Sequence, residues 1–470
     1  MDERSAGCST LTVWYFFSGL AIGLLLVACS DGDGNPAKRP ITFSSRSDSL
    51  CHGLRTDNRF EVIPALDKPA YLEPYTDPVF GTRVVRISDT RFGEVVKPMY
   101  STIQTWNADE SLMILYHTSG EAPGHYLYDG QTYERLKRLD ILTASIEEVF
   151  WHHSDPASFF YISALFSQYG SLMKYNTQTD TEVELANFAA VCGDGVGSKA
   201  GNAVMMPSWD DNSFGFRCGL PERDVAFSYH VDSGRIARRD IGEGTRFEPW
   251  YAPMPGPSGE RYLLNDWVLS ADLSRIEAQL DFYEFHSHSS IGRLANGNDA
   301  LFATGFDPSP DGCRGALDEG LGALIVHDLS NGRCRPVISA SAGYGDPISG
   351  THISATGHQR PGWVALSTIG YEQFSYLTDL RPAPVLLSEI YLADTDPDKP
   401  EVCRLAHHRS HAKGSANGGY NSYLGEPHAT MSPSGSRIVF GSDWHDSGSV
   451  DSYVIELPAY EGPVDNLRDM

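Results

Sequence analysis

The sequence predicts an all-β fold and, within that class, a seven-bladed β-propeller formed by one large domain. Glycine at 45, proline at 28 and aromatic residues at 11% of 470 residues are typical of many short strands joined by tight turns. Blocks rich in leucine or alanine that would form long helices are scarce beyond the N-terminal segment. A strand–turn–strand pattern recurs at roughly fifty-residue intervals, which is the spacing of four-stranded propeller blades.

The clearest copy of this repeat lies near the C-terminus. A short strand over 428–431 leads through the turn 432–435 (Ser-Pro-Ser-Gly) into a second strand over 437–443. Further copies begin near Ile103, Val149, Val204, Trp250, Ser289 and Ile353. Their uneven spacing predicts insertions, the largest over 265–290 and 378–425, and long insertions often decorate a binding face. A β-sandwich with additional domains is the alternative fold.

The N-terminal segment predicts export and a lipid anchor. Residues 11–27 are apolar and almost uncharged, are too short for a comfortable transmembrane helix, and end in Leu-Val-Ala before Cys29. This ending resembles a bacterial lipobox, which implies cleavage before Cys29 and lipidation of that residue on a bacterial membrane. An ordinary cleaved signal peptide or a membrane anchor is the alternative. We expect a signal peptide over 1–28, a tether and lead-in over 29–69, the propeller over 70–458 and a tail over 459–470.

The net charge of −25 argues against nucleic acid or anionic membrane as a general partner, because no basic stripe offsets it. A local cluster of arginines and histidines in a cleft remains able to attract a uronate. Six cysteines stay in the exported part, and an oxidising compartment favours disulfides. The economical local pairs are Cys192 with Cys218 and Cys313 with Cys334.

Three histidines at corresponding places in the repeat form the first candidate site. His288, His352 and His428 stand near the start of the inner strand in three consecutive blades, and inner strands of a propeller converge on the central channel. Three imidazoles at one point suit a divalent transition metal. Cys334 offers a thiolate ligand if it forms no disulfide. The alternative is that each histidine satisfies backbone groups at the channel mouth.

Arg261 and Asn265 form the second candidate site. Residues four apart on a strand share a face, so we expect the guanidinium and the amide to lie side by side and bind a carboxylate. Tyr251, at the inner strand of the same blade, is expected near them. The alternative is a surface arginine followed by a turn-forming asparagine.

Two histidine pairs complete the candidates. His117 ends one strand and His125 opens the next, so both are expected to reach over one rim of the channel, whereas His152 and His153 lie in the turn of the next blade. No nucleophile elbow, phosphate loop, HExxH motif or dinucleotide fingerprint occurs where its fold would require it.

The segment 426–435 and the following Phe-Gly-Ser-Asp-Trp (440–444) resemble the last blade of the bacterial β-propeller polysaccharide lyases, which include oligogalacturonate and ulvan lyases. Oligogalacturonate lyases hold their metal with a glutamine and two closely spaced histidines, a cluster that is missing here. Ulvan lyases are more similar, because they combine histidines, a tyrosine and an arginine followed four residues later by an asparagine. The resemblance implies β-elimination on an acidic polysaccharide, ulvan first and pectin-derived oligogalacturonate second. A non-catalytic carbohydrate- or peptide-binding propeller is the alternative from another class.

In β-elimination a base removes the C5 proton α to the uronate carboxylate, and the 4-linked sugar leaves. We expect Arg261 and Asn265 to neutralise the carboxylate. The expected base is His117, His125 or Tyr251, and Tyr251 is expected to protonate the leaving oxygen. His152 and His153 are the second choice for the histidine pair that meets the substrate. The resemblance further implies a zinc bound by histidine and cysteine, which His288, Cys334 and His428 fit in type. We expect a structural zinc, manganese or calcium ion among His288, Cys334, His352 and His428, and no organic cofactor.

Overall fold

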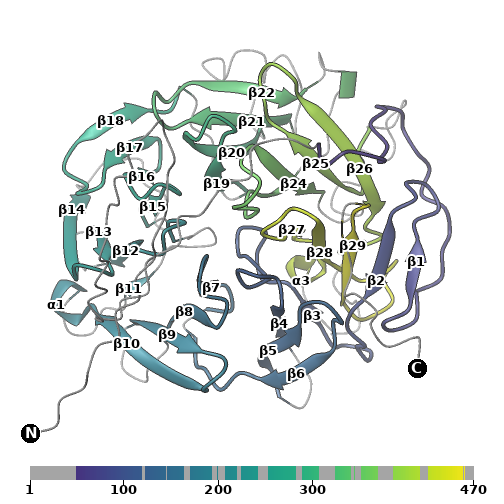
Figure 1. Cartoon of the computed structure of the whole chain (residues 1–470), viewed down its shortest axis with the longest axis horizontal. Helices are drawn as coiled ribbons and strands as arrows, with labels where there is room; N and C mark the ends of the chain where they lie inside the picture. Colours follow the sequence, from purple (N-terminus) through teal and green to yellow (C-terminus); the bar gives the residue numbers. More distant parts are fainter. Residues whose placement is uncertain are drawn as a thin grey trace, which may run out of the picture. The chain divides into compact units, whose positions relative to one another are not determined.

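Residues 43–470 form one compact unit in which seven antiparallel sheets surround a common centre (Figure 1). The computed structural model describes residues 49–118, 122–143, 145–163, 170–192, 198–199, 207–219, 224–241, 252–281, 288–305, 323–339, 343–344, 351–368, 385–412, 422–458 and 460. Six sheets have four strands and the seventh has five. The predicted seven-bladed β-propeller is therefore confirmed.

Each blade runs from an inner strand at the centre to an outer strand at the rim. Blade 1 consists of β3 (Val96–Lys97), β4 (Leu112–His117), β5 (Gly124–Asp129) and β6 (Arg135–Arg138). Blade 2 consists of β7 (Val149–Trp151), β8 (Ser158–Ile162), β9 (Ser171–Asn176) and β10 (Thr181–Asn187). Blade 3 consists of β11 (Ser198–Lys199), β12 (Ser213–Gly219), β13 (Asp224–His230) and β14 (Arg235–Ile241). Blade 4 consists of β15 (Met254–Pro255), β16 (Arg261–Leu264), β17 (Trp267–Ser270) and β18 (Ile276–Gln279). Blade 5 consists of β19 (Ser290–Arg293), β20 (Asp299–Gly305), β21 (Ala323–Asp328) and β22 (Cys334–Ile338). Blade 6 consists of β23 (His352–Ser354), β24 (Trp363–Ser367), β25 (Glu389–Asp394) and β26 (Glu401–His407). Blade 7 consists of β27 (Thr430–Met431), β28 (Arg437–Ser442) and β29 (Asp451–Glu456), followed by the N-terminal strands β2 (Arg83–Arg86) and β1 (Pro74–Thr76).

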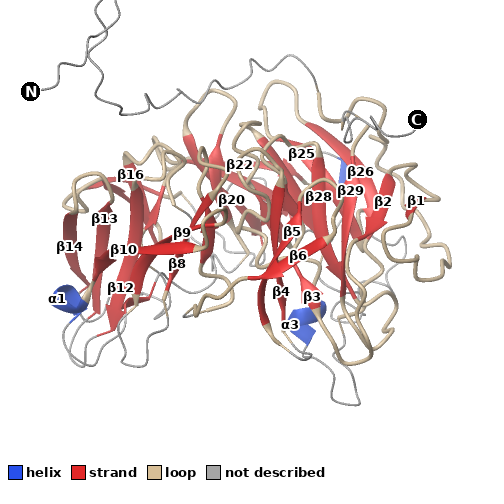
Figure 2. Ribbon diagram, turned by 60° about the horizontal axis from the view of Figure 1, so that its bottom comes forward, coloured by secondary structure: helices blue, strands red, loops and turns tan. Residues whose placement is uncertain are grey.

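Two short helices accompany the sheets. α1 (Ala189–Cys192) follows blade 2, and α3 (Ser422–Gly425) lies beside β3 and β4 (Figure 2). No helix in the described part of the chain has the length and apolar character needed to cross a membrane.

The largest predicted insertions prove to contain blade strands. Residues 265–290 include β17 and β18, and residues 378–425 include β25 and β26. β18 carries an exposed Ile276 and a charged neighbour, because an outermost strand packs on one face only and so loses the apolar pattern that identifies inner strands.

N-terminal residues close the ring of blades. β2 pairs with β29, and β1 pairs with β2, so the two ends of the propeller share one sheet. Ahead of these strands the chain runs along blade 6, where the Arg404 backbone N–H donates to the Arg55 carbonyl. A disulfide between Cys51 and Cys403 fixes the same contact.

Of the disulfides, the predicted pair Cys192–Cys218 is confirmed, and Cys334 is disulfide-bonded. Cys51–Cys403 was not predicted, because its partners stand 352 residues apart and only the closure of the ring brings them together.

Replacing Cys51 with serine should lower the free energy of unfolding by roughly 2–4 kcal/mol, since the unfolded chain regains the freedom that this cross-link removes. Urea unfolding of the variant and of the oxidised wild type measures the difference. When both proteins are reduced, the difference between them should disappear, and equal stability of the two oxidised proteins would contradict the assigned role of this bond.

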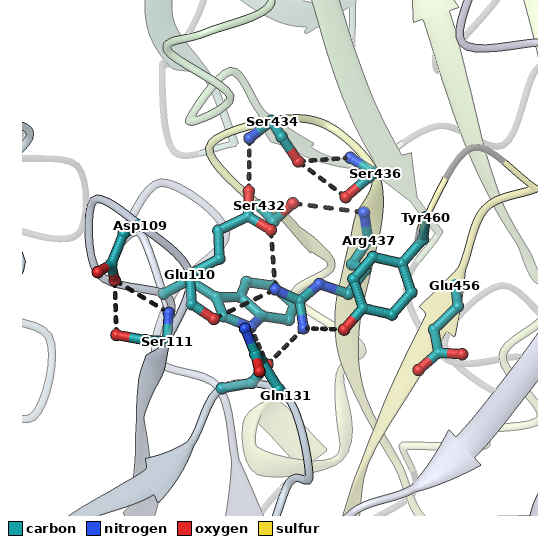
Figure 3. A network of polar contacts seen from close by, with 12 residues as sticks. Asp109, Glu110, Ser111, Gln131, Ser432, Ser434, Ser436, Arg437, Glu456 and Tyr460 are labelled. Atoms are coloured by element: carbon teal, nitrogen blue, oxygen red, sulfur yellow. Dashed lines mark hydrogen bonds and ion pairs between the residues drawn. The ribbon is translucent and has the colours of Figure 1, made fainter. Parts of the chain in front are cut away.

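A buried arginine joins blade 7 to blade 1. The Arg437 guanidinium donates to a Glu110 carboxylate oxygen at 2.8 Å and to the carbonyl of Gly130, with its carbon 5.1 Å from the centroid of the Trp106 ring and 4.5 Å from that of Tyr460 (Figure 3). Its side chain is only 1% exposed. This cation therefore neutralises a Glu110 carboxylate of blade 1 from a buried position in blade 7.

Candidate metal and substrate site

Three histidines meet where the inner strands of blades 5, 6 and 7 begin. His352 opens β23, and His288 and His428 each stand two residues before their strands, β19 and β27. The ring centroids of His288 and His352 are 4.7 Å apart, and those of His352 and His428 are 4.4 Å apart. The repeat alignment predicted this convergence. We call the end of the channel that carries these residues the histidine face.

Glu426 supplies a carboxylate to the same cluster. Its Oε2 atom lies 3.4 Å from His352 Nε2 and 3.3 Å from His428 Nε2. The candidate ligand atoms of His352, Glu426 and His428 all lie within 4.8 Å of one another, and all three residues are buried. Imidazole nitrogens with one carboxylate oxygen form a donor set suited to zinc or manganese.

Lys97, from the inner strand of blade 1, approaches the cluster from the other side. Its Nζ atom lies 2.7 Å from His428 Nδ1 and also donates to the carbonyls of Tyr423 and Glu426. Burial lowers the pKa of Lys97 to about 8, although the charges of Glu426 and Glu147 act in the opposite direction. Where Lys97 is deprotonated, its amine nitrogen can accept a hydrogen bond from His428 Nδ1–H, which leaves Nε2 with a lone pair for a metal.

The protonation states of the histidines also suit a metal. Burial lowers the pKa of His288 to about 4 and holds the pKa values of His352 and His428 well below the usual value. All three rings are therefore neutral near pH 7, the form that coordinates metals. The Nδ1 atom of His352, which is fully buried, has no hydrogen-bond partner among the described residues. The residues present thus fit a divalent metal.

A tyrosine and a second glutamate border the cluster. The Tyr423 hydroxyl of α3 donates to the Glu147 carboxylate just before β7, and its ring centroid lies 4.7 Å from that of His428. Burial first, and then the charge of Glu147, raise the pKa of Tyr423 far above its ordinary value. This hydroxyl therefore stays protonated at any working pH. Tyr100 packs its ring against both His352 and His428.

Sequence reasoning missed Lys97, Tyr100, Glu147, Tyr423 and Glu426. Two signals were available, because Glu426 stands two residues before His428 in the quoted motif and Lys97 ends the short inner strand of blade 1. The repeat was aligned at Ile103 instead, where the chain forms an irregular continuation of that strand with a single bridge from Trp106 to Met113.

The opposite end of the channel carries a different histidine cluster. His153 follows β7 and donates from Nδ1 to Asp211 at 2.7 Å, while His152 Nδ1 lies 2.8 Å from the other oxygen of Asp211. Burial acts to raise the pKa of Asp211, but these two histidines hold it below its ordinary value. The His153 ring packs against His358 of blade 6, with centroids 5.1 Å apart.

His358 is 3% exposed and also packs against Trp209 of blade 3, with ring centroids 6.2 Å apart. Side chains from three blades thus meet across the centre where the inner strands end. Access to the central cluster is consequently expected from the histidine face. His152 and His153, predicted to bind substrate, lie at the end away from His352.

Arg261 and Asn265 do not lie side by side, which corrects the expectation from their spacing. Arg261 opens β16 next to the end of β15, and its Nε atom lies 3.2 Å from Glu277. Asn265 follows β16 in the turn to β17, with a φ of 56°. They share a face by parity, but four residues along a strand span roughly 13 Å. The turn-forming asparagine, our alternative, is what the backbone shows.

His117 and His125 also point apart. In the register of blade 1, His125 pairs with Tyr116 and His117 pairs with Gly124, so the two imidazoles project from opposite faces of the sheet. His125 donates from Nε2 to the Ile146 carbonyl at 2.9 Å, and His117 Nε2 contacts the Tyr128 hydroxyl at 2.8 Å. The expectation that both reach over one rim is therefore wrong.

Cys334 is not placed to bind the central metal. It begins β22, the outermost strand of blade 5, and it is disulfide-bonded. Tyr251 and Cys29 lie outside the described residues.

Comparison with known proteins identifies the fold. No protein-family model and no curated protein matches the sequence. A solved oligogalacturonate lyase in complex with manganese is 14% identical, with a TM-score of 0.56 over 82% of this chain and 96% of that chain. An oligogalacturonate lyase from Vibrio parahaemolyticus is 13% identical, with a TM-score of 0.54 over the same shares of the two chains. The chain thus shares the seven-bladed propeller fold of these lyases.

Proposed function

We propose that the protein is a polysaccharide lyase that cleaves a uronate-containing chain by β-elimination at the histidine face. The observation that carries the proposal is the buried cluster of His352, His428 and Glu426, with the His288 ring packed against His352, at the histidine face of the channel. The fold shared with two oligogalacturonate lyases supports it. β-Elimination needs a positive centre beside the uronate carboxylate, because negative charge grows there as the C5 proton leaves.

A divalent metal held by these four side chains would supply that positive centre. The imidazole-rich donor set favours manganese or zinc over calcium, which prefers six to eight oxygen ligands. One of the two structural neighbours is described as a complex with manganese, which makes that ion the first to test. Lys97 fixes the orientation of His428 through Nδ1.

Two tyrosines are proposed to move the protons. Tyr423 is proposed to give the leaving sugar oxygen its hydroxyl proton, which in this structure hydrogen-bonds to Glu147. Of the predicted base candidates, His117 and His125 have contacts in blade 1 away from the cluster. Tyr251 stands three residues before β15, close to the position that His288 and His428 hold relative to their own strands, and is proposed as the base.

Oligogalacturonate is the proposed first substrate, with ulvan second. The argument for ulvan rested on histidines, a tyrosine and the pair of Arg261 and Asn265, and the strand separates the last two. Purified protein should be given oligogalacturonate, polygalacturonate, ulvan and alginate, while the ultraviolet absorbance of unsaturated uronate ends is followed. A rise with any of them supports the lyase, and a rise with ulvan alone would reverse the order. Binding without any product would favour a non-catalytic carbohydrate-binding propeller.

The protein is further proposed to be exported and lipid-anchored through Cys29. Cys29→Ala should prevent fatty-acid labelling and move the protein from the detergent phase to the aqueous phase, because one cysteine carries the anchor. Metabolic labelling and detergent partitioning of the expressed full chain measure both effects. An N-terminus that retains residues before Cys29 in wild-type protein would contradict the proposal.

A further inference from the structure

A second groove lies at the rim of the propeller, between blade 1 and the closing strands of blade 7. It has a volume of about 890 Å³, within the range of small-molecule binding sites. Residues 71–72 and 88–94, on either side of β2, form one wall. The outer strands β5 and β6 of blade 1 form the other, together with His117 at the end of β4.

Aromatic rings line this groove. Tyr126 stacks on His117 with ring centroids 4.0 Å apart, and the Tyr128 hydroxyl holds the His117 Nε2 atom. Tyr71 lines the opposite wall and is 37% exposed. Tyrosine rings along one groove offer flat apolar faces to a ligand.

The lining of the same groove carries a small excess of positive charge on an acidic protein. Four cationic side chains line it against three acidic ones, whereas the whole chain carries a net charge of −25. Arg91, Arg135 and Arg138 have no carboxylate within ion-pair distance in the described part of the chain. Arg135 lies over the Tyr126 ring at 5.7 Å, which orients its guanidinium beside an aromatic face.

We propose that this groove is an accessory binding site for an acidic polysaccharide. Tyrosine faces pack against the C–H faces of sugar rings, and arginine forks bind carboxylates in a planar, bidentate geometry. Burial lowers the pKa of His117 to about 4, so its ring stays neutral and serves as packing surface. This inference shares its ligand, an acidic polysaccharide, with the proposed function, but binding in the groove does not depend on catalysis at the histidine face. A polymer bound in the groove would stay near the histidine face, while short fragments would diffuse away.

The test measures binding to polygalacturonate by affinity electrophoresis of the full chain in a His352→Ala background, so that the polymer is not consumed. The double variant Tyr71→Ala/Arg135→Ala should bind roughly tenfold more weakly, equivalent to about 1.4 kcal/mol. Arg91→Ala should show a smaller loss. Arg275→Ala is the matched control, because it removes the same charge from a side chain that is 74% exposed in blade 4.

With the His352 side chain intact, the double variant should turn over short oligogalacturonates at the wild-type rate and lose efficiency on dilute polymer alone. Unchanged polymer affinity in the double variant would overturn the proposal. Equal losses in Arg275→Ala, or equal binding of a neutral glucan, would also overturn it, since both would show non-specific attraction. If no substrate is cleaved by the wild type while the groove variant still loses binding, the lyase proposal fails and the groove stands.

Discussion

His352→Ala is expected to remove the bound metal and to lower turnover by roughly two to three orders of magnitude, the loss typical when stabilisation of transition-state charge is removed. His352 is the central ring of the three, within 4.7 Å of His288 and 4.4 Å of His428 by ring centroids, and 3.4 Å from Glu426 Oε2. Without the His352 ring, the other three side chains lose the one residue that contacts all of them. Elemental analysis of the purified protein and the initial rate of unsaturated product formation measure the two effects.

Two comparisons make this result specific. His52→Ala changes an exposed histidine and should retain both metal and rate. Chelation of the wild type should reproduce the loss of rate and lower the melting temperature, while the melting temperature of His352→Ala should no longer respond to added manganese, because a ligand that binds only the folded state stabilises it. Wild-type protein that contains no metal, takes up none and still cleaves substrate would contradict the proposed role.

The repeat and its turns were predictable from the sequence, because each blade must bury apolar inner strands and turn sharply at its ends. The predicted starts at Val149, Ser289 and Ile353 fall within one residue of the starts of β7, β19 and β23. Where an outer strand is polar, as in β18, the same reasoning gave an insertion. The apolar pattern of a strand depends on how many of its faces are buried. The sequence of one strand alone therefore does not show whether it is an inner or an outer strand of its blade.

The site was predictable to the extent that it follows the repeat. His288, His352 and His428 share one position in three blades, so a correct blade register brings them together. Lys97 and Tyr423 reach the cluster from an irregular inner strand and from a short helix, and neither has a counterpart in the repeat. The Arg261 and Asn265 pair failed for a different reason. The alternation of side chains shows which residues share a face of a strand, but it does not show how far apart they lie along that strand.

Arg437→Ala is expected to destabilise the propeller by about 3–5 kcal/mol, the usual cost of removing one partner of a buried ion pair. The substitution leaves the Glu110 carboxylate without its cation and the Gly130 carbonyl without that donor, both at the junction of blades 7 and 1. It also empties the space against the rings of Trp106 and Tyr460. Urea unfolding followed by tryptophan fluorescence should show a lower midpoint.

The charge and the packing of Arg437 are separated by two further variants. Arg437→Met keeps most of the buried volume but leaves Glu110 unpaired, and should remain strongly destabilised, whereas the double variant Arg437→Met/Glu110→Gln removes both charges and should recover part of the loss. A coupling energy of about 1 kcal/mol or more between the two positions is expected for groups in direct contact. Additive effects, or an Arg437→Ala variant as stable as the Arg275→Ala surface control, would show that the ring of blades closes without this ion pair. In that case the pairing of β2 with β29 would be the main structural link between the ends of the propeller.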